Sequence, residues 1–438
     1  MFSADEKLME KWSPVLEHGD VPGIDDRYKK AVTARLLENQ EVALREERVQ
    51  QSFGQIDEAH ANATGSNIAN FDPVLISLVR RAMPNLIAYD IAGVQPMSGP
   101  TGLIFAMKSK FSTQGGSEAL FDEANTGFSG TGTQQAGSTG LEGVTDADTD
   151  KTIADEDTTH TLGEGLPTAT AEQRGMTGGA GAPFGEMAFS IEKSTVTAKS
   201  RALKAEYTME LAQDLKAIHG LDAEGELANI LSAEILAEIN REVVRTVLVK
   251  AKLGAQQANA TIKGIFNLSS DSDGRWMAEK FKGLIMQIER EANVIAKETR
   301  RGKGNYVIVS SDVASALAAS GMLDYSPAIS ASLNVDDTGN TFAGVLNGRV
   351  KVYIDPYATT DFVCVGYRGP NPYDAGLFYC PYVPLTMVKA VGEEDFQPRI
   401  GFKTRYGMVA NPFVEADGTG TDRQNPYFRI FRVDEMMD

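Results

Sequence analysis

Three aspartates at alternate positions have the spacing of metal ligands. Asp146, Asp148 and Asp150 match the first three ligand positions of a calcium-binding loop, in which carboxylate oxygens surround the ion. Such a loop needs a glycine at its sixth position and a bidentate glutamate at its twelfth, but Lys151 and Asp157 occupy those positions here. The segment is therefore interpreted as a solvated acidic loop, and no metal site is predicted.

Histidine and nucleophile patterns give no support for catalysis. No histidine stands in a zinc-ligand pattern, and no G-x-S-x-G nucleophile elbow is present. The stretch RRGKGN at 300–305 lacks the spacing of a phosphate-binding loop. No catalytic residue, cofactor or metal is expected, and the chain is predicted not to be an enzyme. The histidines are His18, His60, His160 and His219.

Charge and cysteine content exclude two further classes of protein. The sequence has 60 acidic and 42 basic residues, a net charge of −18, so a broad basic face for nucleic acid is not expected. The two cysteines, Cys364 and Cys380, fall in one late region rich in predicted strands. So few cysteines predict buried free thiols in a reducing compartment rather than a scaffold of disulfides.

Length and hydropathy bound the organisation of the chain. The start, MFSADEKLMEKW, has no apolar segment of the kind found in secretory signals. No apolar run approaches the roughly 18 residues that span a bilayer, so no membrane segment is expected. The 438 residues exceed the usual single-domain size of roughly 100 to 200, which predicts several domains or one domain with large excursions.

The N-terminal part of the sequence predicts helices rather than a domain. A capping box at residues 3–6 predicts a helix that Pro14 ends. A second helix is predicted over residues 26–51. Because its apolar seam is narrow and Asn39 interrupts it, this helix cannot bury much surface alone. We interpret this arm as an interaction segment.

The middle of the sequence predicts an extended excursion. Residues 101–112 and 186–206 have strand patterns, and the stretch between them, 113–183, is dominated by Gly, Thr, Ser and Asp. That stretch offers too little apolar surface to offset the entropy of ordering, so it is expected to be largely loop. Two strands joined by such a loop predict a long hairpin.

The remainder of the sequence mixes helices with strands. Apolar residues at helical spacing predict a long helix over 221–254 that Gly254 ends, preceded by a shorter helix over 205–220. An amphipathic helix is predicted over 275–299, and strands dominate after it. Helices mixed with antiparallel strands indicate an α+β fold rather than a doubly wound sheet.

Six blocks of this sequence resemble the major capsid protein of T-even-type tailed phages. They run in the order of that family, and together they are specific for it. The resemblance implies the Hong Kong 97-like phage capsid fold, which is an α+β fold. The blocks are NLIAYDIAGVQPMSGPTGLIFAM (85–107), AKSRALKAEYTMELAQDLKAIHG (198–220), EINREVV (238–244), VYIDPYA (352–358), VGYRGPNPYDAG (365–376) and GFKTRYGM (401–408).

The resemblance also implies a division of the chain into the parts of that fold. The long hairpin corresponds to an extended loop, the E-loop, and the long helix to the spine of a peripheral domain. Relatives carry a sizeable insertion domain within the E-loop, whereas the corresponding stretch here is short and acidic. The expected parts are a scaffold-facing N-terminal propeptide at 1–58, an N-arm at 59–100, the E-loop at 101–200 with its Gly/Thr-rich insertion at 113–183, the peripheral domain with its spine helix at 201–261, the axial domain at 262–380, and the returning peripheral domain with a C-terminal strand at 381–438.

The stretch QIDEAHANATGSN at 55–67 is either a plain linker or a place where the chain is cut. Precursors in the family are trimmed by a prohead protease after a Leu/Ile-x-Glu pattern, which Ile56 and Glu58 match. The resemblance therefore implies cleavage before Ala59. The cut would remove 13 acids and 8 bases and leave a net charge of −13.

The implied function is that of a shell protein. Copies would form hexameric capsomers of an icosahedral or prolate head that encloses double-stranded DNA without sequence-specific binding. The expected partners are other copies, a vertex protein, a portal, outer decoration proteins, and a scaffold and prohead protease during assembly. The implied location is the virion, after assembly in the host bacterial cytoplasm.

Three alternatives remain open from the sequence. One is the paralogous capsid protein that builds pentamers at the vertices of the same phages. A second is an encapsulin-like compartment shell, which has the same fold but needs neither a propeptide nor a portal. The third is an enzyme of unknown type, which the lack of a converging His, Cys or acid cluster disfavours.

Overall fold

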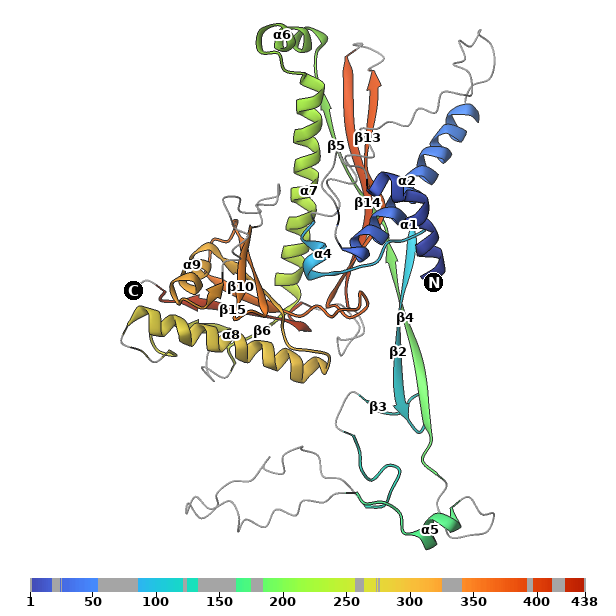
Figure 1. The fold of residues 1–438 in the computed structure, drawn as a ribbon, viewed down its shortest axis with the longest axis vertical. Helices are drawn as coiled ribbons and strands as arrows, with labels where there is room; N and C mark the ends of the chain where they lie inside the picture. Colours follow the sequence, from blue (N-terminus) through green and yellow to red (C-terminus); the bar gives the residue numbers. More distant parts are fainter. Residues whose placement is uncertain are drawn as a thin grey trace. The chain divides into compact units, whose positions relative to one another are not determined.

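The computed structural model of the chain forms two compact units (Figure 1). The larger unit consists of residues 1–103 and 195–438, and the smaller unit of residues 104–194. The structure describes residues 2–17, 24, 26–53, 86–120, 124–132, 163–174, 184–256, 264–272, 274, 276–324, 341–391, 397–411 and 422–436.

The helices and strands follow one another in a mixed order along the chain. The helices are α1 (Phe2–Leu16), α2 (Arg27–Phe53), α4 (Ala88–Ile91), α5 (Thr168–Gln173), α6 (Met209–His219), α7 (Ala223–Lys250), α8 (Met277–Thr299) and α9 (Ser311–Ala319). The strands are β1 (Gly93–Val94), β2 (Thr101–Phe111), β3 (Glu118–Ala119), β4 (Met187–Thr197), β5 (Lys199–Glu206), β6 (Ala251–Leu253), β7 (Ile265–Asn267), β8 (Tyr306–Ser310), β9 (Leu323–Asp324), β10 (Thr341–Leu346), β11 (Val350–Asp355), β12 (Phe362–Gly366), β13 (Leu377–Val391), β14 (Pro398–Ala410) and β15 (Asn425–Asp434).

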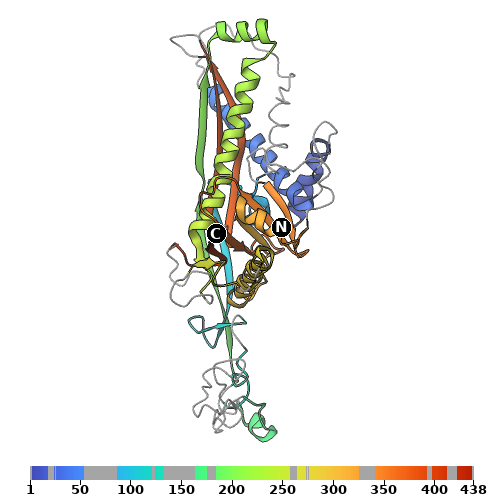
Figure 2. The same cartoon turned by 90° about the vertical axis from the view of Figure 1, so that its left-hand side faces the viewer.

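A four-stranded sheet of the larger unit has the order β1-β13-β14-β5. Its long strands β13 and β14 pair antiparallel from Leu377 with Ala410 to Val391 with Pro398. The long helix α7 packs on β5 and β14 and lies along them in Figures 1 and 2. The buried side of α7 carries apolar residues at helical spacing, among them Ile235, Ile239, Val243 and Val247.

The two ends of the long helix differ in how well the sequence predicts them. At the start, the carboxylate of Asp222 accepts a hydrogen bond from the backbone N–H of Glu224 at 3.3 Å, as an N-cap does. At the other end the prediction is wrong, because the helix ends at Lys250 and not at Gly254. The residues between them form β6, which pairs in parallel with β15, so sheet pairing competes successfully with the helix.

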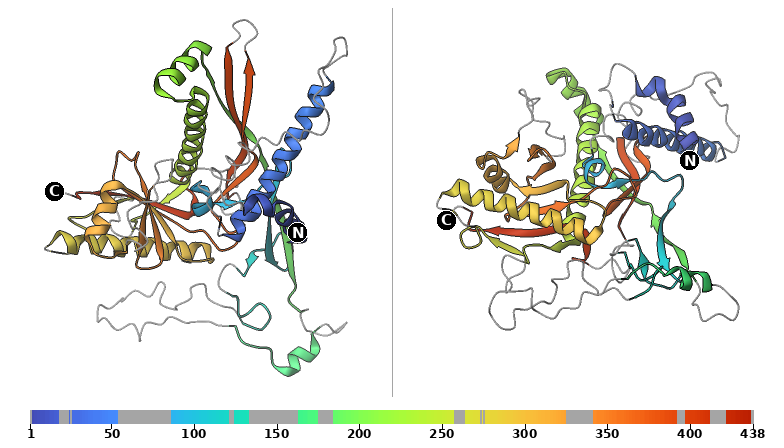
Figure 3. Two further views of the ribbon diagram at one scale, coloured as in Figure 1. Left: turned by 45° about the horizontal axis from the view of Figure 1, so that its top comes forward. Right: turned by 60° about the horizontal axis from the view of Figure 1, so that its bottom comes forward.

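The second sheet of the larger unit has eight strands, in the order β6-β15-β12-β8-β11-β10-β9 with β7 beside β15. Strands β8 and β12 are buried at every position, which is typical of strands covered on both faces. Helix α8 packs on β12 and β15, as Figure 3 shows for β15, and α9 packs on β8 and β11.

Strand direction in this sheet corrects one expectation. Strands β8 and β12 are antiparallel, but β8 and β11 are parallel, so the prediction of antiparallel strands is wrong for the second pair. Parallel neighbours require a crossover connection, and α9 supplies part of it between β8 and β11. The α+β class predicted from the sequence is confirmed.

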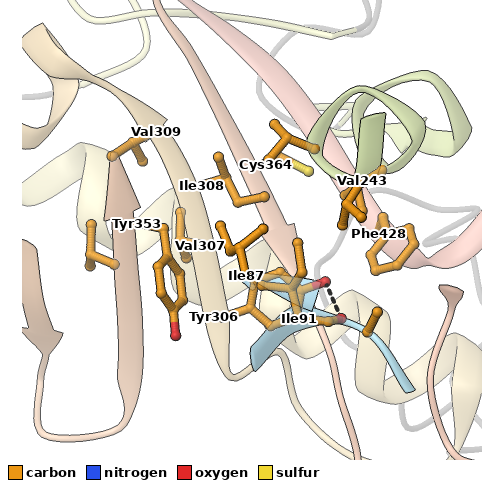
Figure 4. Packing of buried hydrophobic residues seen from close by; sticks show 14 of the residues in the cluster. Ile87, Ile91, Val243, Tyr306, Val307, Ile308, Val309, Tyr353, Cys364 and Phe428 are labelled. Carbon is orange, nitrogen blue, oxygen red and sulfur yellow. Dashed lines mark hydrogen bonds between the residues drawn. The ribbon is translucent and has the colours of Figure 1, made fainter. Parts of the chain in front are cut away.

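The core of the larger unit joins α4, α7 and the second sheet (Figure 4). The hydroxyl of Tyr306 donates to the carbonyl oxygen of Ile91 at 3.2 Å, which links the second sheet to α4. Val243 of α7 and Cys364 of β12 are fully buried in the same cluster. The expectation of buried free thiols is confirmed, since Cys364 and Cys380 are both buried and unpaired.

The smaller unit contains most of the predicted hairpin. Strands β2 and β4 form a ribbon, with the short β3 on the outer side of β2. The segment 186–206, which we predict as one strand, is two, because β4 pairs with β2 whereas β5 joins the four-stranded sheet. Within 113–183 the described residues are 113–120, 124–132 and 163–174, and β3 and α5 are the named strand and helix among them. The rest of this stretch lies outside the described part of the chain.

The N-terminal helices are longer than the sequence predicts. Helix α1 continues through Pro14 to Leu16, so the expectation that Pro14 ends it is wrong. A proline inside a helix removes its own N–H and crowds the carbonyl four residues earlier. Even so, Glu17 donates to the carbonyl of Ser13 at 3.0 Å, and Leu16 is buried. Packing of Leu16 thus outweighs the local effect of the proline. Helix α2 is confirmed.

Candidate assembly surfaces

One face of the β2–β4 ribbon is apolar and uncovered. Alternate residues of a strand point to the same side of a sheet, and on this side both strands carry large apolar residues. Their exposed fractions range from 56% to 71%. We call this set the ribbon face; it consists of Phe105, Met107, Met187, Phe189 and Ile191.

Behind the ribbon face, the opposite side of the ribbon carries small or polar residues, among them Ala106, Lys108, Ala188 and Ser190. There Lys108 of β2 and Glu192 of β4 form an ion pair at 3.0 Å across the strands. The contrast between the two sides is the pattern of a sheet that packs one face against a neighbouring layer. Among the described residues of the smaller unit, only β3 and α5 accompany the ribbon, and α5 has no buried residue. A two-stranded ribbon with an exposed apolar face of this kind marks a surface for another protein.

A second surface is formed by the N-terminal helices, which pack together as a hairpin. Lys11 of α1 donates to Glu38 at 2.6 Å and to Glu41 at 2.8 Å, and the Trp12 indole N–H donates to Glu38 at 3.0 Å. The hydrogen bond from Lys11 lowers the pKa of Glu38 below its ordinary value. These contacts fix α1 against α2, so the two helices form one structural element.

This helical hairpin also packs on the first sheet of the larger unit. The side-chain amide of Asn39 donates to the carbonyl oxygens of Met97 at 2.8 Å and Tyr382 at 2.9 Å, and the Tyr28 hydroxyl donates to the carbonyl of Val94. Burial raises the pKa of Tyr28 well above its ordinary value, so the hydroxyl remains a donor. The arm therefore contacts the chain directly before the ribbon begins.

A polar brace holds the spine helix to the first sheet. Arg201 of β5 donates to Glu238 at 2.6 Å and also to Glu242 of α7 and Tyr406 of β14. Burial lowers the pKa of Arg201, but hydrogen bonds to Glu242 and Tyr406 outweigh it and raise the pKa above its ordinary value. Charge-assisted bonds of this kind are stronger than neutral ones, and here one guanidinium connects three elements.

The residues that the sequence singles out for processing or metal binding are placed as follows. Ile56, Glu58 and Ala59 lie outside the described residues, as does the acidic run that begins at Asp146. His219 is exposed in the last turn of α6. Among the described residues, no three His, Cys, Asp or Glu side chains come together in a way that could hold a metal ion.

None of the helices in the described part of the chain combines the length and the apolar character needed to cross a bilayer.

Sequence comparison decides the family. Residues 68–433 match the family described as "Major capsid protein Gp23". The chain belongs to the Gp23 major capsid protein family. It is therefore a structural protein of the tailed-phage virion, and the family is not enzymatic. The resemblance to T-even-type capsid proteins and the absence of an enzyme function, both expected from the sequence, are confirmed by this family membership.

Individual Gp23 relatives match over nearly their whole length. The major capsid protein of Salmonella phage ViI is 41% identical, over 97% of this chain and 97% of its own. The major capsid protein of Enterobacteria phage T4 is 37% identical, over 94% of this chain and 92% of its own. The capsid vertex protein of the same phage is 30% identical, but over only 52% of this chain and 54% of its own.

Solved structures give a more distant likeness. The chain aligns with one in the capsid of Myoviridae phage XM1 at 9% sequence identity with a TM-score of 0.40. The alignment covers 80% of this chain and 92% of the other. A score this low decides nothing by itself, and the family membership rests on the sequence matches.

One of these surface features had a signal in the sequence, and another was missed. The segment MAFSI alternates apolar with small or polar residues, and TGLIFAM does so except at Ile104; this pattern correctly predicts strands. Alternation does not reveal whether the apolar side meets the same chain or another one. Asn39, which we expected only to interrupt an apolar seam, instead bridges two backbone carbonyls.

Proposed function

We propose that this capsid protein assembles into hexameric capsomers of an icosahedral or prolate head, and that the ribbon face is covered by a neighbouring copy. The observation that carries the proposal is the exposed apolar side of the β2–β4 ribbon, with Met107 71% and Ile191 61% exposed. Soluble chains rarely leave a contiguous apolar surface open. In a closed ring of copies each copy meets its neighbours through the same surfaces, so this face is covered in every copy of the ring.

The free energy gained by burying the ribbon face is large enough to support assembly. Full burial of one large apolar side chain contributes about 1.5–3 kcal/mol, so five contribute on the order of 10 kcal/mol before costs. Much of that offsets the loss of freedom on association. Each contact is then weak, and its repetition around a ring makes the shell stable.

A hexamer is favoured over a vertex pentamer by the extent of the sequence matches. The major capsid proteins align with nearly the whole chain, whereas the vertex protein of phage T4 aligns with about half of it, 52%. The expected partners in the head are a vertex protein, a portal and outer decoration proteins, with a scaffold and a prohead protease during assembly.

Processing at Glu58 is the second part of the proposal. Cleavage between Glu58 and Ala59 would separate residues 1–58 from the subunit that persists in the virion. Helix α2 ends at Phe53, shortly before Ile56. The peptide bond between Glu58 and Ala59 therefore follows the last described turn of the arm. Because α2 packs on the first sheet, cutting the chain would leave the arm bound until the contacts of Asn39 and Tyr28 are also lost.

The acidic charge of the subunit supports its role around DNA. Removal of the arm would change the net charge from −18 to −13. An acidic subunit repels the phosphate backbone on average, so packaged double-stranded DNA would slide along the wall without sequence-specific binding. A solved shell with an inner face lined by Lys and Arg would contradict this part of the proposal.

Loss of the ribbon face tests the assembly proposal. The double variant Phe105→Ser, Phe189→Ser removes two exposed rings, so the subunit should fold normally and fail to form shells. Its matched control is Met286→Ser, which removes an apolar side chain 74% exposed on α8. Electron microscopy should show shells for the control and none for the ribbon variant. Normal shells from the ribbon variant would refute the role of this face.

A further inference from the structure

A pocket lined by arginines lies where α7 meets the second sheet. It encloses about 420 Å³ and is lined by residues of α7, the β11–β12 connection, β15 and the segment before β15. All of these residues belong to the larger unit. The lining includes four arginines and one carboxylate. These are Arg241, Arg245, Arg423, Arg432 and Asp355; we call the site the arginine pocket.

Two of the four arginines are already paired. Arg241 donates to both oxygens of the buried Asp355 at 2.7 Å, and its guanidinium lies 5.3 Å from the centre of the Tyr357 ring. Arg432 pairs with Asp434 at 2.7 Å while its side chain stays 57% exposed. These contacts hold two guanidinium groups in place at the pocket and leave part of their donor capacity unused.

The other two arginines have no ion-pair partner among the described residues. Arg245 of α7 and Arg423 are both exposed, and neither forms an ion pair with a described carboxylate. The lining carries four positive charges against the single charge of Asp355. In a chain with a net charge of −18, a concentration of cations at one hollow favours an anionic occupant.

We propose that the arginine pocket binds the acidic segment 142–157 of a second copy of this chain. That segment carries seven acids and one base, a net charge of −6. Guanidinium groups hold carboxylates in a planar, two-bond geometry, and several carboxylates on a peptide can enter one hollow. The proposal rests on the proposed assembly, because neighbouring copies in a shell raise the effective concentration of the segment.

A peptide is favoured over DNA as the occupant. A duplex presents its phosphates on a convex surface, and its charged backbone binds best to an extended basic face. The arginine pocket is a hollow, and the net charge of the chain opposes a basic face. Pairing opposite charges between copies would also reduce the repulsion that a charge of −18 imposes on every subunit contact.

Peptide binding to the full-length chain tests the pocket without requiring shells. The probe is a labelled synthetic peptide of residues 142–157, measured by fluorescence anisotropy at low salt. The full-length chain that presents the pocket, called the host, has its own segment 142–157 neutralised, so that this segment cannot compete with the labelled peptide for the pocket. The host substitutions are Glu142→Gln, Asp146→Asn, Asp148→Asn, Asp150→Asn, Asp155→Asn, Glu156→Gln and Asp157→Asn.

Charge reversal at Arg245 and Arg423 should weaken peptide binding by at least about tenfold, because two attractive pairs become repulsive. The variant is Arg245→Glu with Arg423→Glu. The control, Arg290→Glu with Arg349→Glu, makes the same change in net charge at two exposed arginines outside the arginine pocket, and should bind within about twofold of the host. Equal binding by both double variants would overturn the proposal.

Two further measurements separate the alternatives. If a short DNA duplex binds with the same arginine dependence and the peptide does not, the site is for phosphate and the proposal is wrong. In shell assembly, the neutralised segment and the reversed arginines should each lower the yield, and their combination should be no worse than either alone. Additive losses would contradict a shared contact. Peptide binding by the host, together with failure of the unmodified chain to form shells, would refute the assembly proposal and leave the pocket intact.

Discussion

The side-chain amide of Asn39 on α2 donates to the carbonyl oxygen of Met97, 2.8 Å away and 58 residues further along the chain. The same amide reaches Tyr382 on β13 at 2.9 Å. One side chain of the arm thus joins the segment that leads into the ribbon to the central strand of the first sheet. The arm is therefore attached to the subunit by specific polar contacts as well as by the chain itself.

Replacement of Asn39 by leucine should loosen this attachment. Asn39→Leu keeps a similar volume but leaves two carbonyl oxygens without their donor, which costs about 1–3 kcal/mol. Hydrogen exchange of the α2 amides in the uncut chain should become faster by about 5- to 100-fold. The control Val42→Ala changes an exposed position of the same helix. Unchanged exchange in Asn39→Leu would show that the contact does not hold the arm.

Removal of the Arg201 guanidinium should weaken the junction of the spine helix with the first sheet. The side chain is 32% exposed, so solvent reduces the effect, and Arg201→Met should lower the free energy of unfolding by about 1–2 kcal/mol. The control is Lys204→Met on the same strand, which removes the ion pair with Glu206; the lysine side chain is 77% exposed. This variant should lower the free energy of unfolding by less than about 0.5 kcal/mol. Denaturant titration measures both variants. Equal losses would mean that the brace contributes no more than a surface ion pair.

The two cysteines should be unreactive in the folded subunit. Burial raises the pKa of the Cys364 thiol from 9.0 to about 12 and that of Cys380 likewise to about 12. Since the thiolate is the reactive form, iodoacetamide at pH 8 should label neither cysteine until the chain is unfolded. Rapid labelling of either one in the native subunit would show that its surroundings open to solvent.

The same shifts predict a loss of stability at alkaline pH. In the unfolded chain these thiols ionise near their ordinary value, whereas the folded chain keeps them protonated. Above that value the unfolded state binds fewer protons, so stability falls as pH rises. The fall should extend from about pH 9 towards pH 12. Replacing Cys364 and Cys380 by alanine should flatten this part of the unfolding profile, and an unaltered slope would assign it to other groups.

Processing at Glu58 predicts the mass of the chain in finished particles. A subunit that begins at Ala59 should be found by intact-mass measurement. Glu58→Gln should block the cut, because the pattern requires glutamate at that position, whereas Asp57→Asn should be cut normally. A full chain from Met1 in mature heads of the unmodified protein would contradict the processing proposal.

The sequence predicts elements of this fold better than their ends and partners. Helical spacing locates α7, yet Gly254 does not end it, because pairing of β6 with β15 depends on residues far along the chain. In the same way Pro14 fails to stop α1, where burial of Leu16 outweighs the local effect. Local propensities hold where tertiary contacts agree with them and fail where distant contacts outweigh them.

The candidate surfaces, too, could be predicted only in part from the sequence. Alternation in β2 and β4 is visible in the sequence, but only the structure shows that no layer of the described smaller unit covers Phe105 and Phe189. The arginine pocket has no local signature, since Arg245 and Arg432 come from segments nearly two hundred residues apart. Sites assembled from distant segments require the fold before they can be recognised.

Coverage of the ribbon face in a finished shell tests the assembly proposal most directly. A cryo-electron microscopy map of assembled heads would show whether Phe105, Met107, Phe189 and Ile191 are covered. We expect a second copy of the chain to pack on these side chains in every capsomer. A finished shell in which this face remains open to solvent would contradict it.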